Sequence, residues 1–278
     1  MRAIRLRLDD VWAYRYLLSN LVLRDLKLRY KNSILGFLWS LVNPMLLMLV
    51  FTTVFTVMLP NLAVPKYPVF VMCGVLPWNF FGTAVTASIH IVPQSGHLIK
   101  KVYFPLEILP FSTVLSNFVN FVLAFIVLFL MVLVFRIPVR PAILLLPVIM
   151  LLHLLYTAGI SMLLATLNVF YRDTGVIMDV MMQAWFFLTP VFYPLEMLPH
   201  VKMIAGIAVP VRRLLYVLNP MASIIASYRS VLYGTAPAMI PHAPAWDFLA
   251  RTAVTVVLVF FLGLWVYSRQ SHRFAEEV

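Results

Sequence analysis

The stretch ILGFLWSLVNPMLLMLVFTTVFTVML, residues Ile34–Leu59, holds 26 residues without one charged side chain. A helix rises about 1.5 Å per residue, so this stretch would reach about 39 Å, whereas about 20 apolar residues already cross a bilayer. Pro44 lies inside the stretch, and we expect it to kink the helix. The stretch therefore predicts a first membrane-spanning helix.

Five more runs of this kind follow along the chain. Pro77 divides the second run, His153 is the only ionisable group in the fourth, and Asp179 lies near the start of the fifth. The composition agrees, because 63% of the 278 residues are hydrophobic and 11% are charged, whereas soluble domains carry about 25% charged residues. The sequence predicts an all-α integral membrane protein with six transmembrane helices, at about 34–59, 67–91, 108–135, 141–170, 176–193 and 246–267.

The basic residues predict how these spans are oriented. Six spans place both termini on one side, and that side carries thirteen of the 21 lysines and arginines, most of them in the first 33 residues. Cytoplasmic segments of membrane proteins are enriched in such residues. We therefore expect both termini in the cytoplasm, including the tail 269–278. The net charge of +11 then reflects membrane topology and anionic lipid, and nucleic acid is not an expected partner.

The N-terminal segment 1–33 contains an amphipathic pattern over Val11–Lys31. Asn20 and the basic residues Arg24, Lys27 and Lys31 recur at helical spacing, with apolar residues over much of the remaining surface. This pattern predicts a helix that lies in the membrane surface, with its cations toward lipid headgroups. A simple basic anchor beside the first span is the second interpretation, and the two are compatible.

Residues 194–245 form an outer segment that is too long for an ordinary loop. Its apolar stretches, Met203–Val211 and Leu214–Leu218, are too short to cross a bilayer. Asn219 and Pro220 have the residue types of a helix N-cap and first position, and Gly234 would end that helix. We expect two short re-entrant helices here, which makes the segment a candidate gate, because non-spanning backbone at membrane depth needs shelter by protein or a water-filled cavity.

The sequence carries no recognisable catalytic or metal-binding motif. A Walker A loop, a GxGxxG loop, a serine nucleophile elbow and paired carboxylates inside a span are all missing, and Cys73 is the single cysteine. His153, deep in a span, could be functional, although a neutral histidine hydrogen-bonded between helices is the alternative. A proton-driven carrier would need buried Asp or Glu. The pattern predicts a conduit that has no catalytic site, cofactor or metal of its own and takes its energy from elsewhere.

Two cytoplasmic connections are candidates for contact with that energy source. The first, GHLIKKVYFPLE at Gly96–Glu107, has room for a two-turn helix at 95–103 before Pro105. A helix mixing apolar and basic residues suits docking into a partner's groove, although an ordinary turn with positive-inside lysines is the alternative. The second connection, NVFYRDTG at Asn168–Gly175, places Arg172 beside Asp173.

Six segments, taken in order, resemble permease subunits of type-2 ABC exporters. The branch they resemble most exports lipid-linked polysaccharides, such as O-antigen, capsule and teichoic-acid-like polymers. The segments are RDLKLRYKNSILGFLWSLVNP (Arg24–Pro44), CGVLPWNFF (Cys73–Phe81), LIKKVYFPLEILP (Leu98–Pro110), LNVFYRD (Leu167–Asp173), WFFLTPVFYP (Trp185–Pro194) and LNPM (Leu218–Met221).

The resemblance implies a fold and a set of partners. It implies a transmembrane domain over 34–268, a homodimer of permeases, and two separate ATPase subunits that bind ATP and Mg. It implies that a coupling helix at 95–103 seats on the ATPase, that Arg172 and Asp173 lie near the cytoplasmic entrance, and that 194–245 is the outer gate. The coupling residues would be Leu98, Ile99, Lys100, Lys101, Val102 and Tyr103.

The function that follows is export of a lipid-linked glycan across a bacterial inner membrane. Aromatic rings suit the C–H faces of sugars, so two aromatic groups are candidates for the substrate path. They are Trp78, Phe80, Phe81, Trp185, Phe186, Phe187, Phe192 and Tyr193. Interfacial belts or helix packing would explain the same residues. Three functions compete with this one: export of a drug or lipid by the same fold, a membrane-embedded glycosyl- or acyltransferase, and an ion-driven carrier. The transferase would need a cluster of catalytic carboxylates or histidines, whereas Glu107, Asp173 and Glu196 are isolated from one another in the sequence.

Overall fold

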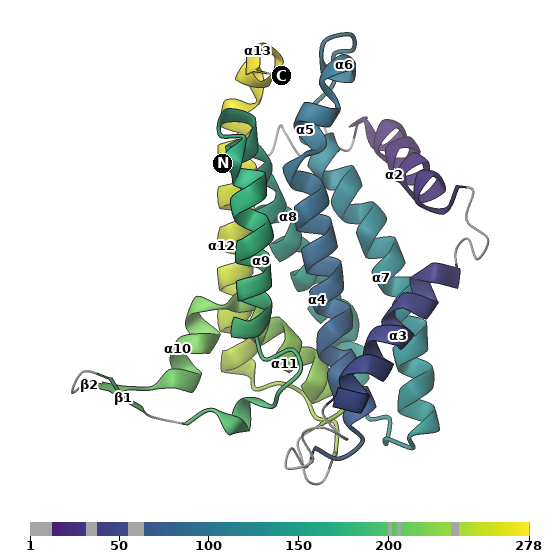
Figure 1. Cartoon of the computed structure of the whole chain (residues 1–278), viewed down its shortest axis with the longest axis vertical. Helices are drawn as coiled ribbons and strands as arrows, with labels where there is room; N and C mark the ends of the chain where they lie inside the picture. Colours follow the sequence, from purple (N-terminus) through teal and green to yellow (C-terminus); the bar gives the residue numbers. More distant parts are fainter. Residues whose placement is uncertain are drawn as a thin grey trace.

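The computed structural model describes residues 13–31, 38–54, 64–199, 202–204, 207–234 and 239–277. The first twelve residues and both ends of the predicted first span, 34–37 and 55–59, lie outside these ranges, so expectations about them are not addressed below. The described chain is a bundle of long helices with shorter elements gathered at both ends (Figure 1).

Four helices in the described ranges are long and apolar enough to cross a membrane. They are α4 (Tyr67–Ile89), α7 (Ile108–Val134), α8 (Leu146–Phe170, entered through a 3₁₀ turn at Pro141–Leu145) and α12 (Trp246–Gln270). Two shorter apolar helices accompany them, α3 (Trp39–Thr53) and α9 (Asp173–Leu188). The chain is therefore a multi-pass membrane protein, and each helix falls on one of the six predicted runs.

Helix α4 is the centre of the bundle. It packs against α3, α7, α8, α9 and α11 (Pro220–Leu232). In its most apolar 18-residue stretch 78% of the residues are buried, compared with a third or less in the corresponding stretches of the other three long helices. Helix α4 continues through Pro77, from Tyr67 to Ile89. Neighbouring helices hold a proline-containing transmembrane helix in place in this way.

Helices α8 and α12 pack side by side through two glycines. A Cβ atom on Gly159 would come within 2.8 Å of the Phe260 backbone, and a Cβ atom on Gly263 would overlap the backbone of Gly159. Small residues allow transmembrane helices to approach this closely. This pair forms the back of the bundle in Figure 1.

Short elements mark the two ends of the bundle. The α6 end carries α5 (Ile91–Gln94), α6 (Gly96–Ile99), the oblique helix α2 (Arg15–Tyr30) and the C-terminal turns Ser271–Arg273 and α13 (Phe274–Glu277) (Figure 1). The opposite, α11 end carries α10 (Val211–Leu218), α11 and a small hairpin.

The start and end of α11 follow the expected chemistry. The Asn219 side chain accepts a hydrogen bond from the Ala222 N–H at 3.4 Å, and Pro220 opens the helix. Gly234, at φ +85°, adopts the left-handed conformation beyond the last turn. Ser223 and Ser227 are buried together with the apolar residues of this helix. Helix α11 is enclosed by α4, α8 and α12.

Two expectations for the outer segment and the fifth span were wrong in detail. The apolar stretch Met203–Val211 contributes to two short strands, β1 (Lys202–Ile204) and β2 (Ile207–Val209), which pair antiparallel as a small hairpin beside the otherwise helical elements of the described chain. A 3₁₀ turn at Leu195–Met197 precedes them. Helix α9 ends at Leu188 instead of Tyr193, because Thr189 precedes a proline and adopts an extended conformation, with ψ 134°.

Candidate functional site

The side chains of the connection Gly96–Glu107, which is predicted to dock on a partner, point in two directions. Helix α6 has one turn, shorter than the expected helix over 95–103, and hydrogen-bonded turns continue from it to Val102. Lys100, Lys101, Val102 and Tyr103 are exposed, and 94% of the Tyr103 surface is accessible. Leu98 and Ile99 instead pack inward. Four of the six predicted coupling residues are thus presented to solvent or a partner.

A small apolar cluster joins this connection to helix α2. Its buried members are Leu21, Phe104, Ile108 and Leu109, with Leu17, Leu18, Leu98 and Ile99 packed against them. Leu21 belongs to α2 and Ile108 to α7, so the cluster connects three elements at the α6 end. A force on the connection would therefore be transmitted to both α2 and α7.

Helix α2 carries the basic residues predicted to face lipid headgroups. Arg24, Lys27 and Lys31 are exposed, and Arg24 forms an ion pair with Asp25 at 2.9 Å. Arg29, which was counted only as one of the basic residues, makes the more specific contact. Its guanidinium donates to Asn117 Oδ1 of α7 at 2.9 Å. The sequence could not reveal this bond because the two residues are 88 positions apart.

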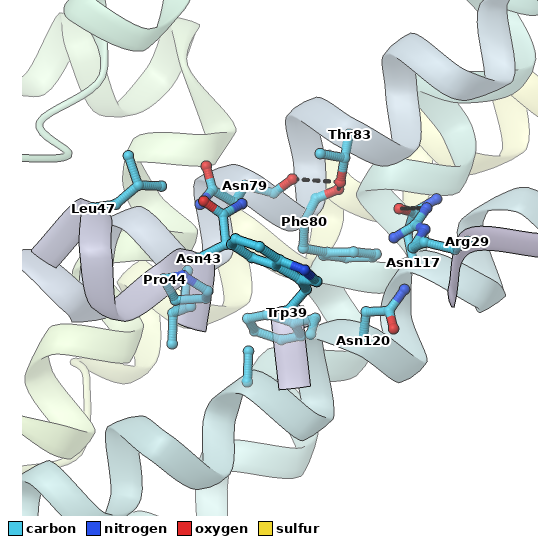
Figure 2. Close-up of a pocket in the computed structure, with 13 residues that line it drawn as sticks. Arg29, Trp39, Asn43, Pro44, Leu47, Asn79, Phe80, Thr83, Asn117 and Asn120 are labelled. Carbon is cyan, nitrogen blue, oxygen red and sulfur yellow. Dashed lines mark hydrogen bonds between the residues drawn. The ribbon is translucent and has the colours of Figure 1, made fainter. Parts of the chain in front are cut away.

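Beside this bond lies a recess of about 390 Å³ between α3, α4 and α7 (Figure 2). We call it the asparagine recess. Its polar lining residues are Arg29, Asn43, Asn79, Thr83, Asn117 and Asn120, and its apolar ones include Trp39, Pro44, Leu47 and Phe80. The recess opens on the surface, because Trp39, Asn43 and Thr83 are exposed.

The polar lining continues from the recess toward the α6 end. A second cavity, of about 750 Å³, shares Arg29, Thr83 and Asn117 with the recess. Its α4 wall extends to Thr86 and His90. Residues 79, 83, 86 and 90 lie on one face of a helix by their spacing. Together the two cavities form a polar groove along α4 and α7.

The predicted cytoplasmic-entrance residues lie where α9 begins. Arg172 immediately precedes the helix, Asp173 is its first residue, and both are exposed. Arg172 also lines a cavity of about 370 Å³ with His90 and Asn168. Because His90 lines the polar groove as well, it lies between this cavity and that groove.

The two aromatic groups predicted for the substrate path come together in the structure. Ring centroids of Phe81 and Trp185 lie 5.1 Å apart, and those of Trp78 and Phe186 lie 5.6 Å apart. Phe186, Phe187, Phe192 and Tyr193 continue the cluster along the end of α9.

Burial divides the same aromatic set. Trp78, Phe80 and Phe81 are buried, whereas 58% of the Phe187 surface is accessible. In this conformation, Phe81 offers no surface on which a sugar could stack. Phe187 offers the largest exposed ring surface of the set, and Trp185, Phe186, Phe192 and Tyr193 are half-buried.

At the α11 end, four consecutive backbone carbonyls receive hydrogen bonds from side chains. Arg229 of α11 donates to Pro190 at 2.6 Å, to Val191, and to Tyr193 at 3.5 Å. The Tyr67 hydroxyl donates to Phe192 at 2.7 Å. We call this arrangement the carbonyl knot. It holds the irregular backbone after α9 against α4 and α11, and Arg229 also lies over the Phe70 ring at 3.8 Å.

A side-chain network extends the knot to the last turn of α9. Trp185 Nε1 donates to Asn219 Oδ1 at 3.1 Å, and Asn219 Nδ2 donates to Thr189 Oγ1 at 2.8 Å. Sequence reasoning identified Asn219 as a helix cap but missed Arg229 as the centre of the knot. The only sequence feature that could have indicated this role is the position of Arg229 between Tyr228 and Ser230, in a helix with a predominantly apolar face.

His153 lies in the core between α8 and its neighbours. Its Nδ1 lies 3.4 Å from the Tyr228 hydroxyl, and its ring meets Phe80 edge-on at 4.8 Å. The contact with Tyr228 matches the interpretation of a histidine bonded between helices. In the part of the chain that the structure describes, no group of three or more His, Cys, Asp and Glu side chains is arranged to hold a metal ion.

Comparison with known proteins gives one family and consistent relatives. A family model described as ABC-2 type transporter matches residues 16–233. An O-antigen export system permease protein RfbA of Myxococcus xanthus is 35% identical over 269 residues, which cover 97% of this chain and 98% of that protein. Two proteins of the same name from Klebsiella pneumoniae are each 28% identical over 91% of both chains.

Proposed function

The chain belongs to the family of ABC-2 type transporters, and from this membership we propose that it is the permease subunit of an ATP-driven polysaccharide exporter. The cargo would be a lipid-linked glycan such as O-antigen or capsule, moved across the bacterial inner membrane. The observation that carries the proposal is the full-length match, at 35% identity, to a relative named as an O-antigen export permease.

The energy source would be two ATPase subunits that bind ATP and Mg. They would dock on the exposed residues Lys100, Lys101, Val102 and Tyr103 at the α6 end. The apolar cluster around Leu21 and Phe104 would carry their movement into α2 and α7. A two-state shift of packed helices is the ordinary way in which such a movement changes access through a membrane.

We further propose that two copies of the chain form the conduit. Helix α9 supports this, because only Gly175 and Met182 of its residues are buried within the chain. Asp179, Gln183 and Phe187 share one exposed face by their spacing. Polar side chains in a membrane span generally face protein or a water-filled cavity instead of lipid. A partner copy across this face would enclose a path lined by Phe187 and its neighbours.

The topology would have six spans and cytoplasmic termini. Helices α3 and α9 would be the first and fifth spans, and α10 and α11 would be re-entrant helices within the outer gate at 194–245. The fully bonded carbonyls of the knot support this assignment, because irregular backbone at membrane depth needs hydrogen-bond partners from protein. The α6 end would then face the ATPase and the α11 end the exit.

Deletion and complementation in the native cell test the proposal. Without the chain, we expect surface polysaccharide to disappear and the lipid-linked polymer to accumulate on the cytoplasmic side, with both reversed by the wild-type gene. Surface polymer is measured by gel electrophoresis of cell extracts, and the accumulated polymer by its inaccessibility to external glycosidase. Unchanged surface polysaccharide together with a new sensitivity to drugs would contradict the proposal and favour another cargo.

A further inference from the structure

The asparagine recess places polar side chains where a membrane protein does not present them to lipid. Asn43 is exposed and Asn79 is half-buried beside the cavity, and the exposed Thr83 donates its hydroxyl to the Asn79 carbonyl at 2.6 Å. Transferring an amide from water to an apolar medium without a hydrogen-bond partner costs about 2–7 kcal/mol. A surface with this lining is stable beside water, a polar ligand or another protein, and unfavourable beside acyl chains.

Helices α8 and α12 provide the contrast. Their exposed residues include Leu151, Val254, Leu258 and Leu262, all of which are compatible with lipid. The same chain therefore builds an apolar outer surface on one pair of helices and an amide-lined recess on another. The recess cannot be explained as an ordinary lipid-facing surface.

The lining specifies which ligand chemistry fits. Each asparagine offers a carbonyl acceptor and two N–H donors, which match hydroxyl groups that both donate and accept. Trp39, which is exposed, adds a ring face on which the C–H face of a sugar can pack. Carboxylates are absent from the thirteen lining residues, so the recess does not have the ligands of a cation site. A neutral polyol with apolar faces fits this combination.

We propose that the asparagine recess binds sugar units of the glycan cargo on their way through the permease, with Arg29 next to them for an acidic sugar or a phosphate. This inference rests on the proposed function and adds a binding site to it. The volume of about 390 Å³ lies within the range of small-molecule sites, about 300–1,000 Å³, and limits occupancy to a short stretch of the polymer.

The bond between Arg29 and Asn117 gives the recess a link to the energy source. Asn117 Nδ2 donates to the Thr113 carbonyl at 2.8 Å while its Oδ1 accepts from Arg29, so this residue is held in place from both ends of its amide. Arg29 belongs to α2, and Leu17, Leu18 and Leu21 of this helix pack on the docking connection. Movement of α2 would therefore shift the guanidinium at the edge of the sugar site (Figure 2).

Photo-crosslinking in the native membrane tests the site. Benzoylphenylalanine replaces Asn43 or Thr83, both exposed, and as a control Leu258, which is 65% accessible on α12. The probe is the radiolabelled lipid-linked glycan made by the same cells. We expect glycan crosslinks from Asn43 and Thr83 and none from Leu258. Export of surface polysaccharide without crosslinks from either recess position would overturn the inference and leave the proposed function standing. Absence of polysaccharide export in wild-type cells would instead count against the proposed function.

A polar-to-apolar replacement gives an independent readout. The double variant Asn43→Leu/Thr83→Val removes two polar groups from the recess, and Thr255→Val is the matched control. Thr255 of α12 donates to the carbonyl four residues before it, as Thr83 does. We expect the glycan concentration for half-maximal stimulation of ATP hydrolysis to rise tenfold or more in the double variant, and to stay at the wild-type value in the Thr255→Val control. A half-maximal concentration equal to that of Thr255→Val would overturn the inference.

Discussion

The asparagine recess and the carbonyl knot are both polar regions of an apolar protein, but they differ in how their polar groups are used. In the knot, Arg229 and Tyr67 supply hydrogen bonds to all four carbonyls from Pro190 to Tyr193. In the recess, the exposed Asn43 side chain lies beside an open cavity, whereas the Thr83 hydroxyl donates to the Asn79 carbonyl. The comparison shows that a polar group hydrogen-bonded within the protein stabilises the fold, whereas a polar group that faces a cavity is available to a ligand.

Replacing the centre of the knot is expected to have the largest effect. Arg229→Met leaves the carbonyls of Pro190 and Val191 buried without their donor, and hydrogen bonds to charged groups contribute about 1.5–3 kcal/mol each. We expect loss of about 3 kcal/mol or more of stability, seen as little folded permease in the membrane. Arg213→Met, which changes an exposed arginine of α10, is the control. Equal yields of the two variants would contradict the structural role of the knot.

The second prediction separates buried from exposed aromatic residues of the proposed path. Phe81→Ala removes a fully buried ring, and such changes cost about 3–5 kcal/mol. Phe187→Ala removes an exposed ring and should leave the melting temperature unchanged while slowing export. Melting of the purified permease and the rate of surface polymer appearance are measured for both. Normal export by a stably folded Phe187→Ala variant would remove that ring from the path.

The third prediction compares two asparagines, one from each region. Asn219→Ala removes the cap of α11 and the partner of Trp185 and Thr189, so we expect a loss of about 2 kcal/mol. Asn43→Ala should change stability by less than about 0.5 kcal/mol, as is usual for exposed sites. Thermal unfolding in one detergent compares the two variants. A larger effect at Asn43 would mean that the recess is a structural element.

Local chemistry made much of this fold predictable. Uncharged runs located every long helix, and the Asn219–Pro220 pair located the start of α11, because caps depend on adjacent residues. The end of α9 could also have been predicted from Thr189 before Pro190, a signal that the length of the apolar run concealed. The hairpin at 202–209 was missed because a short apolar stretch fits a strand as well as a helix.

The site was less predictable, because it depends on contacts between distant residues. The aromatic groups of α4 and α9 were identified, but their burial was not, since it follows from packing around α4. Arg229 and Arg29 were counted only as charges, and their partners lie 36 to 39 and 88 positions away in the sequence. The asparagines of the recess come from three helices and share no sequence pattern.

Changing the docking connection is expected to have the smallest effect on stability. It also tests most directly the central claim that the chain is a permease driven by a separate ATPase. The chain is isolated from its native membrane in mild detergent, its partners are identified, and their ATP hydrolysis is measured, with Lys100→Glu/Lys101→Glu as the variant. The account predicts a stoichiometric ATPase with a Walker motif that is lost from the equally stable variant. Isolation of the wild-type chain without an ATPase, under conditions that preserve other membrane complexes, would contradict the account.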